Sequence, residues 1–167
     1  MNDVLSDPDP AAGFAQGSPG GSNASRQHWM SVLARAPAKA IETALTRDGP
    51  LPAWIRVRGP ETGLVMVRGR AGGSGSPFNL GEMTVTRCTV RLASGIAGHA
   101  YIAGRDERRA ELAAVADALL QNPTTTEALH DSLIRPLAEA QQEQRLNRAE
   151  KAAATRVEFF SMRNMRS

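Results

Sequence analysis

The sequence predicts an α+β domain in which a mainly antiparallel sheet of about four strands is flanked by N-terminal and C-terminal helices. Between residues 53 and 104, apolar and polar residues alternate in runs that short glycine-rich turns separate. Alternation with a period of two is typical of strands, and short connections favour antiparallel neighbours. Before and after this region, apolar residues recur at helical spacing instead.

The chain of 167 residues has a length that suits one domain of ordinary size. Residues 1–24 are rich in Pro, Gly, Ser, Asn and Asp. Such a segment buries too little apolar surface to offset its ordering entropy, so a disordered tail is expected there. Residues 25–162 are expected to form the single domain, and residues 163–167 a short basic tail.

The first expected elements are two helices joined at Pro37. Ser25 is expected to cap the first helix, and Pro37 suits the first position of a second helix over residues 38–47. The apolar stripe of the first helix, at spacings of three and four residues, consists of Trp29, Val32, Leu33 and Ala36.

The expected strands cover residues 53–58, 64–71, 83–92 and 96–103, with turn chemistry at residues 59–63 between the first two. Arginines recur along these strands. The ones expected to share one face of the sheet are Arg56, Arg58, Arg68, Arg70, Arg87 and Arg91.

The C-terminal third predicts three helices. Asp106 is expected to cap an amphipathic helix that breaks at Asn122, and a short helix over residues 127–133 follows. Pro136 is expected in the first turn of a long polar helix that reaches about Arg156. The apolar stripe of the first of these helices comprises Leu112, Val115, Ala116, Leu119 and Leu120.

Charge and cysteine content narrow the class of protein. The formal net charge of +3 is small for this length, and aromatic residues make up only 4%, so a nucleic-acid-binding protein is not favoured. The one cysteine, Cys88, excludes a disulfide framework and is expected to be a buried, inert thiol. Neither a secretory signal nor an apolar run long enough to cross a membrane is present, which favours the cytoplasm.

The glycine-rich stretch that begins at Gly72 and Gly73 is a candidate anion-binding loop, because Arg70 precedes it and backbone amides can form an anion nest. It lacks the Lys-Ser/Thr pair of a phosphate-binding loop, and no helix is expected where it ends. A plain hairpin loop is therefore the competing interpretation.

Arg87 and Arg105 are the other candidate contacts to an anion or a substrate. Arg105 adjoins the N-terminus of the helix that Asp106 caps, where an anion is stabilised; the alternative is a solvated or paired charge. The three histidines are far apart and lack the spacing of metal ligands. No catalytic, cofactor-binding or metal-ligating residue is therefore assigned.

Several short motifs, taken together, resemble one known family. The match runs from about residue 26 to residue 162, and its motifs are specific in combination. They are Arg26-Gln27-x-Trp29-Met30-Ser31-Val32-Leu33-Ala34, Glu61-Thr62-Gly63-Leu64-Val65, Arg70-x-Gly72-Gly73-x-Gly75, Phe78-Asn79-Leu80-Gly81-Glu82, Thr84-x-Thr86-Arg87-x-x-Val90-Arg91-Leu92, Gly104-Arg105-Asp106, Ala116-Asp117-Ala118-Leu119 and Arg156-Val157-Glu158-Phe159-Phe160-Ser161-Met162. The chain resembles the PhnG family of the bacterial carbon–phosphorus lyase system.

This resemblance implies an accessory subunit of a core complex with PhnH, PhnI and PhnJ-type chains and a functional link to PhnL. Such complexes transfer ribose triphosphate from ATP to an alkylphosphonate such as methylphosphonate, releasing adenine and forming alpha-D-ribose 1-methylphosphonate 5-triphosphate. ATP is then a substrate of the complex, and no cofactor is expected on this subunit. Catalysis in such complexes is generally assigned to the PhnI-type partner, so this chain is not expected to be catalytic by itself.

An obligate hetero-oligomer needs apolar anchors at its interfaces. Trp29, Phe159 and Phe160 are the candidates for such contacts. Two hypotheses stay open: an architectural subunit without substrate contact, and a subunit that contributes Arg70, Arg87 or Arg105 to a substrate site.

Overall fold

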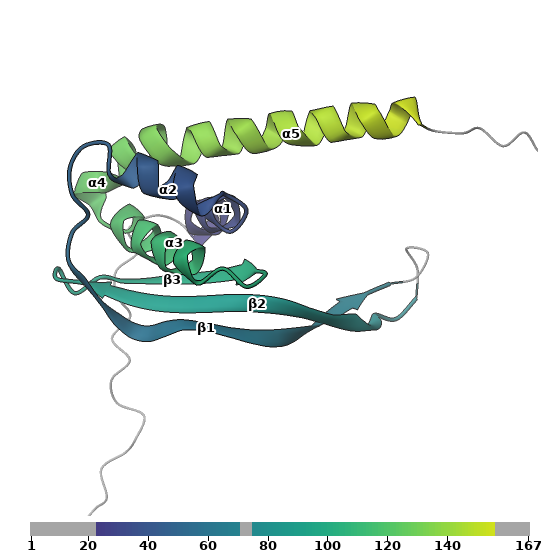
Figure 1. Cartoon of the computed structure of the whole chain (residues 1–167), viewed down its shortest axis with the longest axis horizontal. Helices are drawn as coiled ribbons and strands as arrows, with labels where there is room; N and C mark the ends of the chain where they lie inside the picture. The colour runs from purple at the N-terminus through teal and green to yellow at the C-terminus, as the bar shows by residue number, and fades with distance from the viewer. Residues whose placement is uncertain (1–22, 71–74, 156–167) are drawn as a thin grey trace, which may run out of the picture.

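The computed structural model describes residues 23–70 and 75–155 (Figure 1). Within these ranges the chain is an α+β domain with an antiparallel sheet of strand order β1-β2-β3. One helix lies on the sheet and the others lie over that helix, so that three layers form (Figure 1). The elements are α1 (Asn23–Leu33), α2 (Ala38–Leu45), β1 (Trp54–Gly69), β2 (Phe78–Leu92), β3 (Ala97–Ala103), α3 (Glu107–Leu120), α4 (Pro123–Leu129), the π-helix η2 (His130–Ile134) and α5 (Arg135–Ala154).

The first two predicted strands are one strand, β1, so the described sheet has three strands instead of about four. The expected turn at residues 59–63 is absorbed by irregularities in the pairing with β2, between Arg56 and Arg58 and between Arg58 and Glu61. A bulge lets a strand accommodate an extra residue without reversing. Pro60 is tolerated because β1 is an edge strand, on which one side of the backbone needs no partner.

The other two predicted strands are confirmed, with one boundary shifted. β2 starts at Phe78, five residues before the expected start at residue 83, because its first residues pair with the far end of β1. β3 pairs with β2 only from Val85 to Arg91. The β1–β2 ribbon therefore extends beyond β3 (Figure 1).

Helix α3 is the centre of the core. It was expected to be amphipathic, but every residue from Ala110 to Ala118 is buried, because the sheet covers one side and the other helices cover the opposite side (Figure 1). Its alanines allow close approach to the sheet. A Cβ atom on Gly98 of β3 would lie 2.0 Å from the Ala114 carbonyl oxygen and 2.8 Å from the Ala118 Cβ.

The N-terminal helices pack as expected. The predicted stripe Trp29, Val32, Leu33 and Ala36 is buried in the core, at 0–4% exposure. Helix α1 begins at Asn23, so Ser25 lies inside its first turn and is not the cap. Of the tail expected over residues 1–24, residues 1–22 lie outside the described residues, and residues 23 and 24 belong to α1 instead.

Helix α3 ends at Leu120, before Asn122 as predicted, and the elements α4, η2 and α5 then follow one another without a break. Asn122 caps α4, with its side chain accepting a hydrogen bond from the Thr124 amide, and η2 joins α4 directly to α5. Pro136 lacks the N–H that would donate four residues back, and the π-turn, in which the Arg135 amide donates to His130, precedes it. Its predicted first-turn position is confirmed.

The helices in the described part of the chain are too short or too polar to span a lipid bilayer.

Candidate functional site

Glu111 of α3 is held by two residues of β1. The Trp54 Nε1 donates to its carboxylate at 3.0 Å, and Arg56 donates from Nε at 2.7 Å and from Nη2 at 3.0 Å. The Glu111 side chain is 6% exposed, whereas Arg56 is 59% exposed. The pKa of Glu111 is lowered, mainly by the paired hydrogen bonds from Arg56. Burial acts in the opposite direction and raises this pKa.

Asp117 is the second buried carboxylate, six residues further along α3. Its side chain is fully buried and accepts from Arg26 at 2.8 Å and 3.2 Å, from the Trp29 Nε1 at 2.9 Å and from the His99 backbone amide at 2.9 Å. Gln121 adds a hydrogen bond at 3.2 Å. Asp117 thus connects α1 and β3 to α3. We interpret Glu111 and Asp117 as structural carboxylates that fix α3 to the neighbouring elements.

The Glu111 contact predicts a pH-dependent stability. Because the folded state lowers the pKa of Glu111, its contribution is present above the unfolded value of about 4.3 and is lost as pH falls through the folded value. We expect Glu111→Gln to destabilise the chain at pH 7 by on the order of 1 kcal/mol, a value limited by the exposure of Arg56.

Urea unfolding of both proteins between pH 7 and pH 3 measures this effect. The difference in the free energy of unfolding is expected to shrink below about pH 4. A difference that stays constant over this range would contradict the role assigned to the ionised carboxylate.

The expected single arginine face is wrong. Arg56 faces α3, whereas Arg58 and Arg87 meet on the opposite side at Glu61, at 2.5 Å and 3.0 Å. The bulge between Arg56 and Arg58 shifts the alternation by one residue, so the two arginines point to different faces. Arg87 is therefore already paired, and the hollow beside it holds only about 140 Å³.

The three arginines proposed as anion contacts do not form one site. Arg70 directly follows Gly69, the last residue of β1. Gly69 pairs with Phe78, and Phe78 lies nine residues from Arg87 along β2. This separation is about 30 Å in extended chain. Arg105 is exposed beside Gly104, and the Asp106 side chain caps α3 by accepting from the Arg109 amide at 2.9 Å. Gly72 and Gly73 lie outside the described residues.

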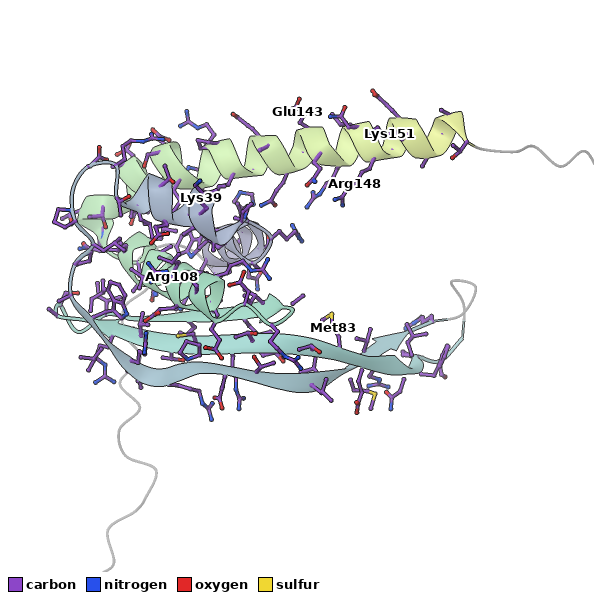
Figure 2. The ribbon with its side chains drawn as sticks, in the orientation of Figure 1. Lys39, Met83, Arg108, Glu143, Arg148 and Lys151 are labelled. Carbon is purple, nitrogen blue, oxygen red and sulfur yellow. The ribbon has the colours of Figure 1, made fainter. Side chains whose placement is uncertain are left out.

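Arginine and lysine also gather along α5. A groove of about 810 Å³ is lined by Arg35 and by residues of α5 that include Glu143, Arg148 and Lys151. Figure 2 shows Arg148 on the side of α5 that faces the sheet. Because Glu143 lies in the same wide, open groove, we assign no anion site to it.

The proposed interface anchors have different outcomes. Trp29 is 2% exposed and lies in the core, with its indole bound to Asp117. It was expected at an interface, but the structure does not leave this side chain at the surface, because a buried indole finds its acceptor within the chain. Phe159 and Phe160 lie outside the described residues.

Cys88 is the buried thiol that the sequence predicted, and His99 contacts the neighbouring strand. Cys88 is 1% exposed, and burial raises the pKa of its thiol to about 11, which leaves it protonated at neutral pH. The His99 Nδ1 lies 3.1 Å from the Thr89 hydroxyl. Across residues 23–70 and 75–155, no group of three or more His, Cys, Asp and Glu side chains is placed to hold a metal ion.

Two comparisons with known proteins establish the family. The model of the family described as phosphonate metabolism protein PhnG matches residues 24–164. The chain belongs to the PhnG family. It is also 49% identical over 142 residues to the alpha-D-ribose 1-methylphosphonate 5-triphosphate synthase subunit PhnG of Rhizobium meliloti (strain 1021), covering 83% of this chain and 88% of that protein.

Large apolar side chains are exposed on the PhnG-family chain where the β1–β2 ribbon leaves the body. We call residues Leu64–Gly69 and Phe78–Thr84 the free arm. β3 ends opposite Val85, and beyond this residue β2 pairs only with β1 in the described sheet. The exposed large apolar side chains of the free arm are Leu64 (63%), Met66 (51%), Phe78 (47%), Leu80 (59%) and Met83 (42%).

The sequence patterns do not single out the free arm, Glu111 or Asp117 as functional features. A signal for the two carboxylates is nevertheless present, since Arg26 and Trp29 are three residues apart and Trp54 and Arg56 are two apart. A buried indole needs an acceptor, and an arginine nearby favours a carboxylate.

Proposed function

We propose that this chain is an accessory, architectural subunit of the complex that transfers ribose triphosphate from ATP to an alkylphosphonate. With methylphosphonate, the product would be alpha-D-ribose 1-methylphosphonate 5-triphosphate, with release of adenine. The proposal is supported by 49% identity to a relative that is named as a subunit of this synthase. We place the complex in the cytoplasm, with PhnI, PhnH and PhnJ-type partners and a functional link to a PhnL-type protein.

The free arm is the observation that carries the architectural role. Five large apolar side chains there are 42–63% exposed. A two-stranded ribbon is marginally stable in water by itself, and monomeric proteins rarely expose an apolar patch of more than a few hundred Å². A surface of this kind favours a chain that functions in an assembly.

The arrangement of the arginines favours scaffolding over substrate contact. Arg87 is neutralised by Glu61 at 3.0 Å, and about 30 Å of strand separates it from the Arg70 end of β1. Arg70 and Arg87 of one chain therefore cannot bind the same triphosphate together. Arg105 keeps an exposed position next to the N-terminus of α3, so we test the alternative hypothesis at this residue.

Reconstitution of the synthase from its purified subunits tests the proposal. Omitting this chain is expected to abolish adenine release from ATP and methylphosphonate, and adding it back is expected to restore the rate. Full activity without this chain would contradict the proposal. Arg105→Ala is expected to leave both assembly and adenine release unchanged, whereas lost turnover in an intact complex would favour substrate contact.

A further inference from the structure

The two halves of the β1 edge are built differently. Near the body, the edge carries Pro60 and two irregularities of register, devices that keep an edge strand from pairing with another chain. Beyond Glu61, every residue up to Val67 pairs with β2 in unbroken register. Because β1 pairs only with β2 in the described sheet, the outer side of Leu64–Val67 is a regular, apolar strand edge.

The side chains of the free arm also lack cover on both faces of the ribbon. Leu64 and Met66 lie on one face of the ribbon, beside their cross-strand partners Thr84 and Glu82. Met83 lies on the other face. Figure 2 shows the Met83 side chain on the same side of the ribbon as α5, where no helix lies against it. A partner that reaches only one face would leave the other exposed.

The charge at the end of the free arm indicates what the partner carries. Arg68 and Arg70 are exposed, and neither has an ion pair among the described residues. Glu82 is the acidic residue of the arm. A partner strand that is apolar and ends in a carboxylate would complement both the apolar run Leu64–Val67 and Arg68, which follows this run.

Pairing of two copies of this chain fits less well. An antiparallel pair centred on Leu64–Val67 would place Arg70 of each copy opposite Glu61 of the other. That carboxylate is already held by Arg58 and Arg87. Each junction would then gather three guanidinium groups around one carboxylate, which is unfavourable.

We propose that the free arm docks an extended, apolar segment of another synthase subunit, which pairs with the outer edge of β1 along Leu64–Val67 and sets a carboxylate beside Arg68. The docked subunit covers Leu64, Met66 and Met83 on the two faces of the ribbon. Addition of a strand to a free edge supplies main-chain hydrogen bonds, and the alternating side chains supply specificity. This inference rests on the proposed function, because it requires the chain to assemble with other subunits.

The chain offers a closely matched control for the test. Leu64 and Met66 are 63% and 51% exposed, and Ile55 and Val57, at the same spacing near the body of β1, are also 63% and 51% exposed. The two double variants, Leu64→Lys with Met66→Lys and Ile55→Lys with Val57→Lys, therefore replace apolar side chains of equal fractional exposure on one strand. Lysine on an edge strand opposes pairing.

Co-purification of the co-expressed synthase subunits with each tagged variant is the measurement. The arm variant is expected to recover at least tenfold less partner than wild type, and the body variant is expected to recover the wild-type amount. Equal recovery by both variants, whether high or low, would overturn the docking proposal. Failure of the wild-type chain to recover any partner would instead overturn the proposed function.

Two further readouts keep the interpretation specific. Circular dichroism melting of the isolated variants should match wild type, because the changed side chains are exposed. Amide hydrogen exchange at Leu64–Val67 is expected to slow in the complex, and protection confined to the β2 edge would overturn the assigned edge. If the arm variant abolished self-association of the chain while partner recovery stayed intact, the arm would be a homodimer contact and the proposed occupant would be wrong.

Discussion

Replacing Asp117 by alanine is expected to lower the free energy of unfolding by about 3–5 kcal/mol, the usual range for breaking a buried ion pair from one side. The fully buried carboxylate accepts from Arg26, Trp29 and the His99 amide. Alanine would leave the indole and the amide without an acceptor, and would leave Arg26 unpaired at one-third exposure. Three elements of the fold meet at this one side chain, so the loss extends beyond a single contact.

Thermal and urea unfolding of the purified chain measure this loss, with a midpoint expected to fall by roughly 10 °C. Asp131→Ala is the matched control, because Asp131 pairs with Arg135 at the surface and is 54% exposed. The control is expected to change stability by about 0.5 kcal/mol or less. Equal effects of the two substitutions would show that the Asp117 contacts do not stabilise the core.

Local features of the fold could be predicted because they depend on neighbours in sequence. The spacing of Trp29, Val32 and Leu33 predicts a buried helical stripe, and these side chains are at most 4% exposed. Asp106 and Asn122 cap α3 and α4 because each side chain reaches a backbone amide two or three residues away. A single sequence contains all the partners that such interactions need.

Long-range features could not be predicted in the same way. The turn residues at 59–63 favour a reversal, yet pairing with β2 keeps β1 extended through two irregularities. The buried carboxylate of Glu111 is 55 residues from Arg56, and that of Asp117 is 91 residues from Arg26. The sequence places both acids in a helix but does not indicate that their partners come from other elements.

The candidate site was predicted only in part. Arg87 and Arg105 are exposed as a contact residue must be, but the sheet does not bring Arg87 and Arg70 together. The alternation rule placed the arginines on one face, and a single bulge divides them between two. The free arm depends on where β3 ends relative to β2, which strand pairing decides and local propensity does not.

Replacing Gly98 by alanine is expected to destabilise the chain by about 3 kcal/mol or more, at the upper end of overpacking effects. The added methyl group would lie 2.0 Å from the Ala114 carbonyl oxygen and 2.5 Å from the Ala118 nitrogen. Both atoms belong to the backbone of α3, so no side-chain rotation relieves the clash. The helix must then move away from β3. This movement would also lengthen the 2.9 Å hydrogen bond that the His99 amide donates to the Asp117 carboxylate.

Gly63→Ala is the matched control, because Gly63 lies in the same sheet, has no left-handed backbone, and has no atom within 4 Å of the place that an added methyl group would take. Alanine there is expected to leave stability within about 0.5 kcal/mol of wild type. Urea unfolding of both variants measures the difference directly. If Gly98→Ala unfolded at the same urea concentration as Gly63→Ala, the close packing of α3 on β3 would be disproved. A large loss confined to Gly98→Ala would instead show that a single hydrogen atom at this position sets the distance between the sheet and its central helix.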